Sequence, residues 1–150
     1  MSALAEAVTA ARESGEYDRV LAELPYARFT GMRAGLEAGH VRLRLPFEPP
    51  LVGNTRAPAF HGGVVGACLE TVALLQLVHQ RGLPFAKTID FTVDYLRLAR
   101  AEELYAYAEI QRLGRRVANV RMFAYQQRRE EPVALGRGNF LLGDGAGPAQ

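Results

Sequence analysis

The first part of the chain has the apolar periodicity of short helices. Residues 3–13 and 16–24 are rich in Ala, Leu and Glu. A Ser-Gly pair separates the two segments and Pro25 follows the second, so we predict one or two short helices that end before this proline. These helices would form a flank or a lid on the rest of the fold.

The pattern then changes to the two-residue period of strands. Residues 29–47 alternate between apolar and polar side chains around a turn at 37–39. Residues 48–60 contain three prolines and a glycine. They predict an irregular loop that leads into the next helix.

A long helix follows the His-Gly-Gly sequence at 61–63 and is expected to reach about Gln80. It is apolar on every side except at Glu70, and a helix that is hydrophobic all round is normally buried. An ionised carboxylate in such a helix costs several kcal/mol unless it is paired or reached by water. The run is short for a membrane span and contains this charge, so we expect no membrane insertion.

Four strands are predicted after the helix. The first follows Pro84 and places Ile89, Phe91, Val93 and Tyr95 on one apolar face. The others are expected at 103–112, 117–127 and 132–142, joined by links too short for crossover helices, so neighbouring strands should be antiparallel. We therefore predict an α+β fold in which a curved antiparallel sheet wraps around a long central helix, with short N-terminal helices.

The expected organisation is an N-terminal helical flank at 1–25, one domain at 26–142 and a disordered tail at 143–150. The central helix has more apolar positions than one sheet face can cover. A symmetric dimer that brings two such helices together would bury the remainder. The alternative is a monomer in which the N-terminal helices cover that face.

Composition and charge restrict the class of protein. With 49% hydrophobic residues the chain can bury the core of one domain, and its single cysteine, Cys68, excludes an internal disulfide. Cys68 lies on the apolar helix, where we expect a packed core thiol. The N-terminus is unlike a secretory signal, so a cytoplasmic protein is predicted. The net charge of +2 is too small to indicate nucleic acid binding.

Three histidines, His40, His61 and His79, follow no metal-ligand spacing, so no metal is predicted. The chemistry is instead expected at the start of the long helix. The backbone N–H groups of Gly62 and Gly63 lack intrahelical partners there and can form an oxyanion hole. Glu70 lies eight residues after Gly62, about 12 Å along a helix. If both act on one substrate, the carboxylate must come from the neighbouring chain of a dimer.

Four sequence motifs carry a resemblance to a known family. They are His61-Gly62-Gly63 with Glu70, D-F-T-V-D-Y-L-R-L-A at 90–99, G-R-R-V-A at 114–118 and G-R-G-N-F-L at 136–141. Over residues 26–142 the chain resembles hotdog-fold acyl-CoA thioesterases of the PaaI-like type. The resemblance implies hydrolysis of an acyl-CoA to free acid and CoA, with no cofactor beyond the CoA of the substrate. It also implies homodimers that pair into homotetramers. Glu70 would be the nucleophile or the general base, and Gly62 the oxyanion donor.

Two positions depart from the family pattern. A polar amide often stands six residues before the His in relatives, whereas this chain has Thr55 there and Asn54 one step further out. Asn54 is the candidate for a residue that orients water or contacts the carbonyl. The common Y-L-R-P-A sequence has Leu98 in place of the proline. Arg97 still matches and would hold a phosphate or the pantetheine region.

The remaining candidates have two interpretations each. His61 is expected to orient the loop or cap the helix rather than act as a general base. Thr71 would bind a water near Glu70 or bond back to its own helix. Phe60, Leu74 and Leu75 would line an acyl pocket or belong to the core. Gly63, Arg115 and Arg116 are further candidates for CoA contacts, although the two arginines could equally occupy a solvated turn.

Two other functions compete with thioester hydrolysis. A hotdog dehydratase or hydratase would act on 3-hydroxyacyl thioesters, but such enzymes generally pair a His and an acid at a different spacing. A non-catalytic acyl-CoA-binding module would bind the ligand without releasing a thiol. The sequence does not identify the acyl group, and it leaves dimer and tetramer open.

Overall fold

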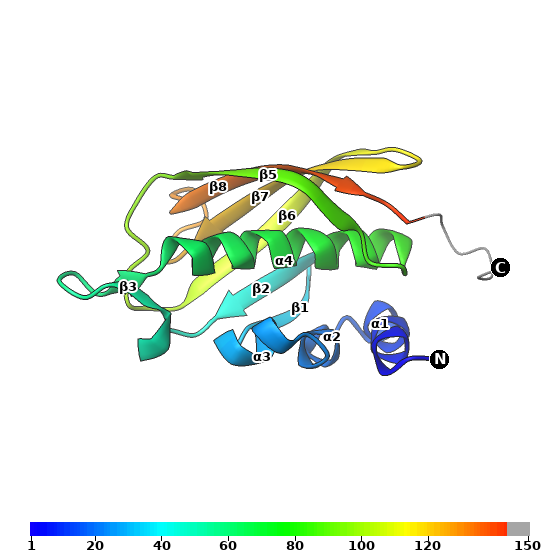
Figure 1. Cartoon of the computed structure of the whole chain (residues 1–150), viewed down its shortest axis with the longest axis horizontal. Helices are drawn as coiled ribbons and strands as arrows, with labels where there is room; N and C mark the ends of the chain where they lie inside the picture. The colour runs from blue at the N-terminus through cyan, green and yellow to red at the C-terminus, as the bar shows by residue number, and fades with distance from the viewer. Residues whose placement is uncertain (144–150) are drawn as a thin grey trace.

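The computed structural model describes residues 1–143, so the predicted tail lies, apart from Gly143, outside the described residues. A six-stranded antiparallel sheet wraps around one long helix, α4, with three short helices on one side of it (Figure 1). The helices are α1 (Ala3–Ser14), α2 (Asp18–Ala22), α3 (Pro25–Thr30) and α4 (Gly62–Arg81), with a 3-10 turn at Pro49–Leu51. The strands are β1 (Arg33–Glu37), β2 (His40–Leu45), β3 (Val52–Asn54), β4 (Ala59–Phe60), β5 (Lys87–Tyr95), β6 (Leu104–Leu113), β7 (Val117–Tyr125) and β8 (Ala134–Leu141).

The sheet has the strand order β1-β2-β6-β7-β8-β5, and every neighbouring pair is antiparallel. α4 packs against β2, β5, β6, β7 and β8. Apolar side chains that alternate along these strands, such as Leu43, Ala106 and Met122, are fully buried. The predicted α+β fold with a curved antiparallel sheet around a central helix is therefore confirmed.

By length and composition α4 could cross a membrane, but most of its apolar residues are buried in the core of the fold. Cys68 has no exposed surface, and burial raises the pKa of its thiol far above the usual range. A thiol that is neither accessible nor ionised is a poor nucleophile. The prediction of a packed core cysteine is confirmed.

α4 carries a buried amide that the sequence analysis overlooked. Gln76 is only 4% exposed, and its Oε1 accepts a hydrogen bond of 2.8 Å from the backbone N–H of Val41. The bond satisfies a donor of β2 where no β6 residue pairs with Val41. The description of α4 as apolar except at Glu70 was therefore wrong.

The N-terminal flank is longer than predicted. The two predicted helices, α1 and α2, end before Pro25, but this proline also begins a third helix, α3, because proline at the first helical position loses no hydrogen bond. The helices therefore continue to Thr30, and Gly31 ends α3 in a left-handed conformation with φ 79°. The boundary at residue 25 and the strand pattern at 29–30 were wrong, since a short helix with one buried side contains too few residues to reveal its period.

A β-bulge changes the face of one predicted strand. The register of β5 against β8 shifts between Thr88 and Asp90, so Ile89 has no partner in β8 and is 55% exposed. Thr88 pairs with Phe140, whose side chain is fully buried, and therefore faces α4. The prediction that Ile89 belongs to the apolar face was wrong, because strict alternation cannot show an inserted residue.

The N-terminal helices pack against the C-terminal end of α4. The Nε of Arg12 donates to the carbonyl of His79 at 3.1 Å, and the buried Tyr17 hydroxyl lies 2.6 Å from His79 Nδ1. The half-exposed positions nearer the start of α4, around Glu70, remain uncovered. The N-terminal helices therefore leave open the face of α4 that they would have to cover in a monomer.

We expect the protein to lose stability as the pH falls through about 6.5. Burial lowers the pKa of His79, and the Arg12 guanidinium lowers it further. The unfolded chain then binds more protons than the folded one below the ordinary His pKa of about 6.5, so acid favours unfolding. Urea denaturation between pH 5 and pH 8 measures this slope. His79→Gln, whose Oε1 can accept from Tyr17, should flatten it, and an unchanged slope in that variant would contradict the assignment.

Candidate active site

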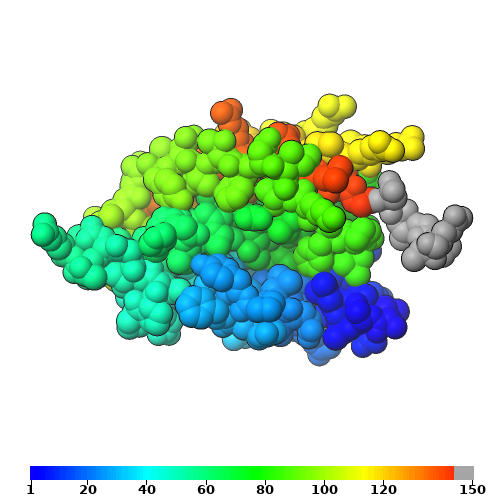
Figure 2. Space-filling model, in the orientation of Figure 1, coloured from blue at the N-terminus to red at the C-terminus, as the bar shows by residue number. Residues whose placement is uncertain are grey.

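A stripe of α4 is left partly open by the sheet and by the N-terminal helices. Each of its residues lies three or four positions from another member, so they share one face of the helix. In the space-filling view, atoms of α4 reach the surface between the N-terminal helices and β5 (Figure 2). The stripe consists of Gly63, Ala67, Glu70, Thr71 and Leu74, of which Gly63 is exposed and the others are half-buried.

The first turn of α4 has one free backbone donor. His61 is the N-cap: its Nδ1 accepts from the N–H of Gly63 at 2.9 Å, and its carbonyl accepts from Val64 and Val65. The N–H of Gly62 has no acceptor within residues 1–143. His61 thus caps the helix, and within residues 1–143 the unbonded N–H belongs to Gly62 and not to Gly63.

Tyr95 holds the start of α4 against β5, a contact that the sequence analysis did not identify. Its hydroxyl donates to the carbonyl of Gly62 at 2.6 Å. A Cβ on Gly62 or Gly66 would lie about 3.5 Å from that hydroxyl, an ordinary van der Waals contact, so the Tyr95 side chain lies close to the first turn of α4. The available signal was the apolar face of β5, since Tyr95 follows Phe91 and Val93 at a spacing of two.

The carboxylate of Glu70 has one partner. Its Oε1 accepts a hydrogen bond of 2.8 Å from the Thr88 hydroxyl, and none of the ion pairs within residues 1–143 includes Glu70. The side chain is half-buried on the stripe. A carboxylate held by one hydroxyl keeps acceptor positions for a water or a proton. Thr88 escaped the sequence analysis because the bulge alone turns it toward α4.

Comparison with known proteins connects this arrangement to a family. The sequence profile of the thioesterase superfamily matches residues 58–133, just over half of the chain, and the match includes the His-Gly-Gly turn, α4 and β5. The chain belongs to the thioesterase superfamily. The medium/long-chain acyl-CoA thioesterase YigI of Escherichia coli K12 is 30% identical to this thioesterase-superfamily chain over an alignment that covers 95% of the chain and 100% of YigI.

Solved structures agree with the fold. A protein from Chromobacterium violaceum superposes on this superfamily member with a TM-score of 0.76 at 35% identity, covering 93% of this chain and 98% of that one. The PaaI protein of the Escherichia coli phenylacetic acid degradation operon gives a TM-score of 0.74 at 19% identity, covering 95% and 98%. The hotdog fold and the predicted membership of a thioesterase family are confirmed.

The apolar candidates for an acyl pocket in this thioesterase-superfamily chain differ in burial. Phe60 is 6% exposed and packs edge to face on Phe47, and Leu75 is fully buried, so both are core residues of the single chain. Leu74 is half-exposed on the stripe. The Thr71 hydroxyl makes no hydrogen bond within residues 1–143, whereas Thr9 of α1 bonds back to its helix. Thr71 is therefore free to bind a water beside Glu70.

Asn54 stabilises a turn. Its Oδ1 accepts from the N–H groups of Arg56 and Ala57 at 3.0 and 3.3 Å, which is an Asx turn between β3 and β4. The amide nitrogen of Asn54 is not used in these bonds, and the residue is exposed. The structure thus gives this side chain a local structural function.

The predicted phosphate-binding arginines lie at opposite ends of α4. Arg97 follows β5 near Gly62, and its guanidinium donates to the Pro132 carbonyl at 2.6 Å. Arg115 and Arg116 occupy the exposed turn between β6 and β7, which Arg81 contacts through the carbonyl of Gly114. A helix of this length separates its ends by about 30 Å. One chain cannot place all three at the same phosphate.

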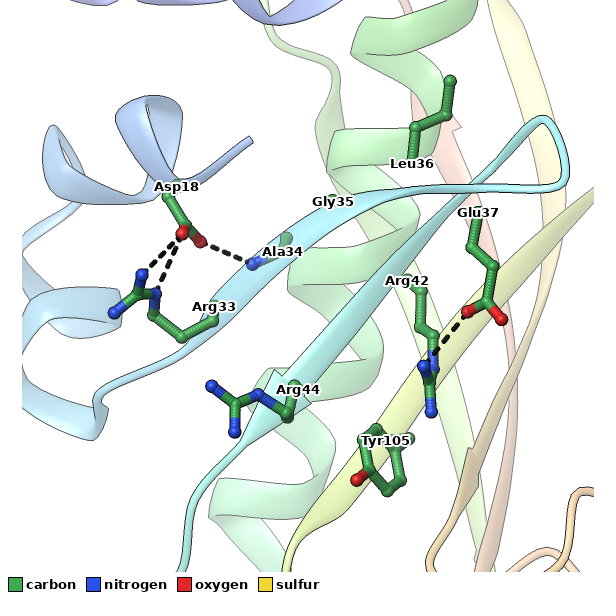
Figure 3. A pocket seen from close by; sticks show the side chains of 9 residues that line it. All are labelled: Asp18, Arg33, Ala34, Gly35, Leu36, Glu37, Arg42, Arg44 and Tyr105. Atoms are coloured by element: carbon green, nitrogen blue, oxygen red, sulfur yellow. Dashed lines mark hydrogen bonds and ion pairs between the residues drawn. The ribbon is translucent and has the colours of Figure 1, made fainter. Parts of the chain in front are cut away.

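A third group of arginines lies on the sheet edge opposite β5 (Figure 3). Arg33, Arg42 and Arg44 line a hollow of about 280 Å³ between α2 and strands β1 and β2. Each is paired with a carboxylate: Asp18, Glu37 and Glu103, at 2.8, 3.1 and 2.7 Å respectively. Paired charges of this kind leave little net attraction for an anion.

Thr88→Val is expected to lower kcat about tenfold, the value of one hydrogen bond to a charged group. The substitution removes the donor to Glu70 and preserves the shape of the side chain. Steady-state kinetics should show the loss in kcat with little change in KM, because Thr88 positions the carboxylate and does not touch the substrate. Thr88→Ser, which restores the hydroxyl, should recover most of the rate. Full activity in Thr88→Val would remove Thr88 from the site.

Proposed function

We propose that this protein is an acyl-CoA thioesterase that works as a homodimer, in which Gly62 of one chain and Glu70 of the other form each active site. The observation that carries the proposal is the pairing of a free N–H and a sparsely bonded carboxylate on one helix. Eight residues, about 12 Å, separate them, so one carbonyl cannot meet both within a single chain. Two antiparallel α4 helices related by a two-fold axis would bring each Gly62 next to the partner's carboxylate.

The reaction follows from these two groups. The Gly62 N–H donates to the thioester oxygen and stabilises the oxyanion that develops when the carbonyl carbon is attacked. Glu70 takes a proton from water, whose oxygen then bonds to the carbon. The carbon–sulfur bond breaks, the carboxylic acid forms, and the thiolate of CoA recovers the proton. In the other route that the same carboxylate allows, Glu70 attacks the carbon directly and the carbon–sulfur bond breaks, releasing the CoA thiolate. Water then hydrolyses the resulting anhydride, which returns the Glu70 carboxylate, forms the acid and supplies the proton that the thiolate takes up.

The acyl group is proposed to be a medium or long chain, on the basis of the likeness to YigI. Leu74 and Ala67 extend the stripe beyond Glu70 with apolar, half-buried surface. Apolar groups there would lose contact with water when an acyl chain binds. The scheme requires no metal or redox cofactor and is compatible with a cytoplasmic location.

A mixed dimer tests the shared site. Chains carrying Glu70→Gln and Gly62→Pro are given different tags, coexpressed, and purified through both tags. Such a dimer has one site with an intact Gly62 and an intact Glu70, so it should show about half of the wild-type turnover. Each homodimeric variant should be nearly inactive. An inactive mixed dimer, or a wild type that is monomeric in sedimentation, would overturn the proposal.

A thiol-release assay over acyl-CoAs of increasing chain length defines the substrate. Medium and long chains should give the highest kcat/KM. Formation of an enoyl product without free thiol would instead indicate a dehydratase. Calorimetric binding of the same compounds without any release would indicate a binding module.

A further inference from the structure

A two-part hollow lies beside the N-terminal end of α4. The polar part, of about 260 Å³, is lined by Arg97, Arg100, Arg128, Glu102 and Glu131, among others. The second part, of about 430 Å³, is mainly apolar and is lined by Ala57, Pro58, Leu98 and Ala101. Leu98, Arg100 and Glu102 line both parts, so the two lie next to each other along this segment.

The arginines of this hollow are less neutralised than those beside β1. The Arg100 side chain takes part in no ion pair within residues 1–143. Arg128 lies 3.8 Å from Glu131, and both side chains are more than half exposed, which makes this a weak surface pair. Guanidinium groups in this state can bind phosphate with forked hydrogen bonds.

The backbone that carries Arg100 is held firmly. The amide of Gln126 accepts from the Arg100 N–H and donates to the Arg100 carbonyl, both at 2.9 Å. The N–H groups of Leu96 and Arg97 both donate to the Val133 carbonyl. A binding residue on a fixed backbone loses less conformational freedom when its ligand binds.

The same segment is bonded to the strand that precedes Gly62. The N–H of Phe60 donates to the Ala99 carbonyl at 2.9 Å, and Ala59 forms a β-bridge with Arg100. Gly62 is three residues beyond Ala59, so at most about 11 Å of backbone separates them. The hollow and the proposed oxyanion donor therefore lie close together in the same chain.

We propose that this hollow binds the nucleotide end of CoA, with its phosphates on Arg100 and Arg128 and its adenine against Pro58 and Leu98. The inference rests on the proposed function and extends it. The adenine ring is flat and largely apolar, and it suits the mainly apolar part of the hollow. The phosphates are anionic and suit the part that contains the arginines. One chain then holds both the nucleotide and the polarised carbonyl, and only the carboxylate comes from the partner.

The competing location is a hollow of about 480 Å³ at the other end of α4, which Lys87 and Arg116 line together with Phe85 and Leu141. Its lining, like that of the first hollow, contains both cationic and apolar side chains. It lies beside the turn that Arg81 contacts, about 30 Å from Gly62 of the same chain. A pair of neutral substitutions there is a matched control, because it removes the same number of charges.

The test compares Arg100→Gln/Arg128→Gln with Lys87→Gln/Arg116→Gln in two measurements. Calorimetry with CoA should show binding weakened tenfold or more in the first variant and by less than twofold in the second. In the thiol-release assay the first variant should raise KM for an acyl-CoA tenfold or more and leave kcat unchanged. Its KM for the matching acyl-pantetheine, which has no nucleotide, should equal that of the wild type.

Unchanged CoA binding in Arg100→Gln/Arg128→Gln, or a loss confined to Lys87→Gln/Arg116→Gln, overturns the assignment. The calorimetric result does not depend on catalysis. If the wild type binds CoA but hydrolyses no thioester, the proposed activity fails while the binding measurement still decides the nucleotide site. If the wild type does not bind CoA, the nucleotide site is rejected, and the thiol-release assay still tests the activity.

Discussion

Replacement of Glu70 by Gln should reduce kcat by about two orders of magnitude or more, because the amide can neither accept the proton of water nor attack the thioester. Gln can still accept the hydrogen bond from Thr88, so the local geometry is retained. The loss should therefore appear in kcat, with KM nearly unchanged. Thiol release from a medium-chain acyl-CoA, measured for both proteins in parallel, gives the ratio.

The fold should tolerate this substitution. Glu70 forms no ion pair with any residue in the range 1–143, so the free energy of unfolding is expected to change by less than about 1 kcal/mol. Urea denaturation and sedimentation of the variant control for unfolding and for loss of the dimer. Full activity in Glu70→Gln would exclude the carboxylate from the mechanism.

Gly62→Pro should lower kcat by about two to three orders of magnitude, the usual loss when an oxyanion donor is removed. Proline has no N–H, and the structure is unusually suited to it here. Gly62 is the first residue of α4, where proline is best tolerated. His61 has φ −58° and ψ 134°, the extended conformation that a residue before proline prefers.

Gly62→Ala is the matched control. It retains the N–H, and its Cβ would lie 3.4 Å from the Tyr95 ring, an ordinary van der Waals contact. This variant should keep most of the wild-type kcat, while the proline variant loses it with little change in the melting temperature. Equal losses in the two variants would mean that space at Gly62, and not its N–H, is what catalysis requires.

Much of the fold could be predicted because its period is visible in the chain. α4 ends within one residue of the prediction, since Gly82 and Pro84 stop a continuous apolar helix. The antiparallel order of β6, β7 and β8 follows from links too short to cross over. The helix that begins at Pro25 was not predicted, because one proline is compatible with both the end of a helix and the start of another.

The candidate site divides in a similar way. Glu70 and Gly62 stand out in the sequence, one as a charge in an apolar run and the other as a glycine at a helix start. Thr88 and Tyr95 do not, because their relation to α4 depends on strand register. A single inserted residue at Ile89 turns Thr88 toward the helix, and no local pattern reports such a bulge.

By itself, then, the amino-acid sequence determined the helix, the strands, and the acid and the donor about 12 Å apart on one helix, because periodicity and rise per residue are local properties. Only the tertiary structure decided which groups hold them. It placed the Thr88 hydroxyl on Glu70, the Tyr95 hydroxyl on Gly62 and the segment of Arg100 beside Ala59. These contacts join residues 18 to 41 positions apart, and their geometry depends on how the sheet curves around α4.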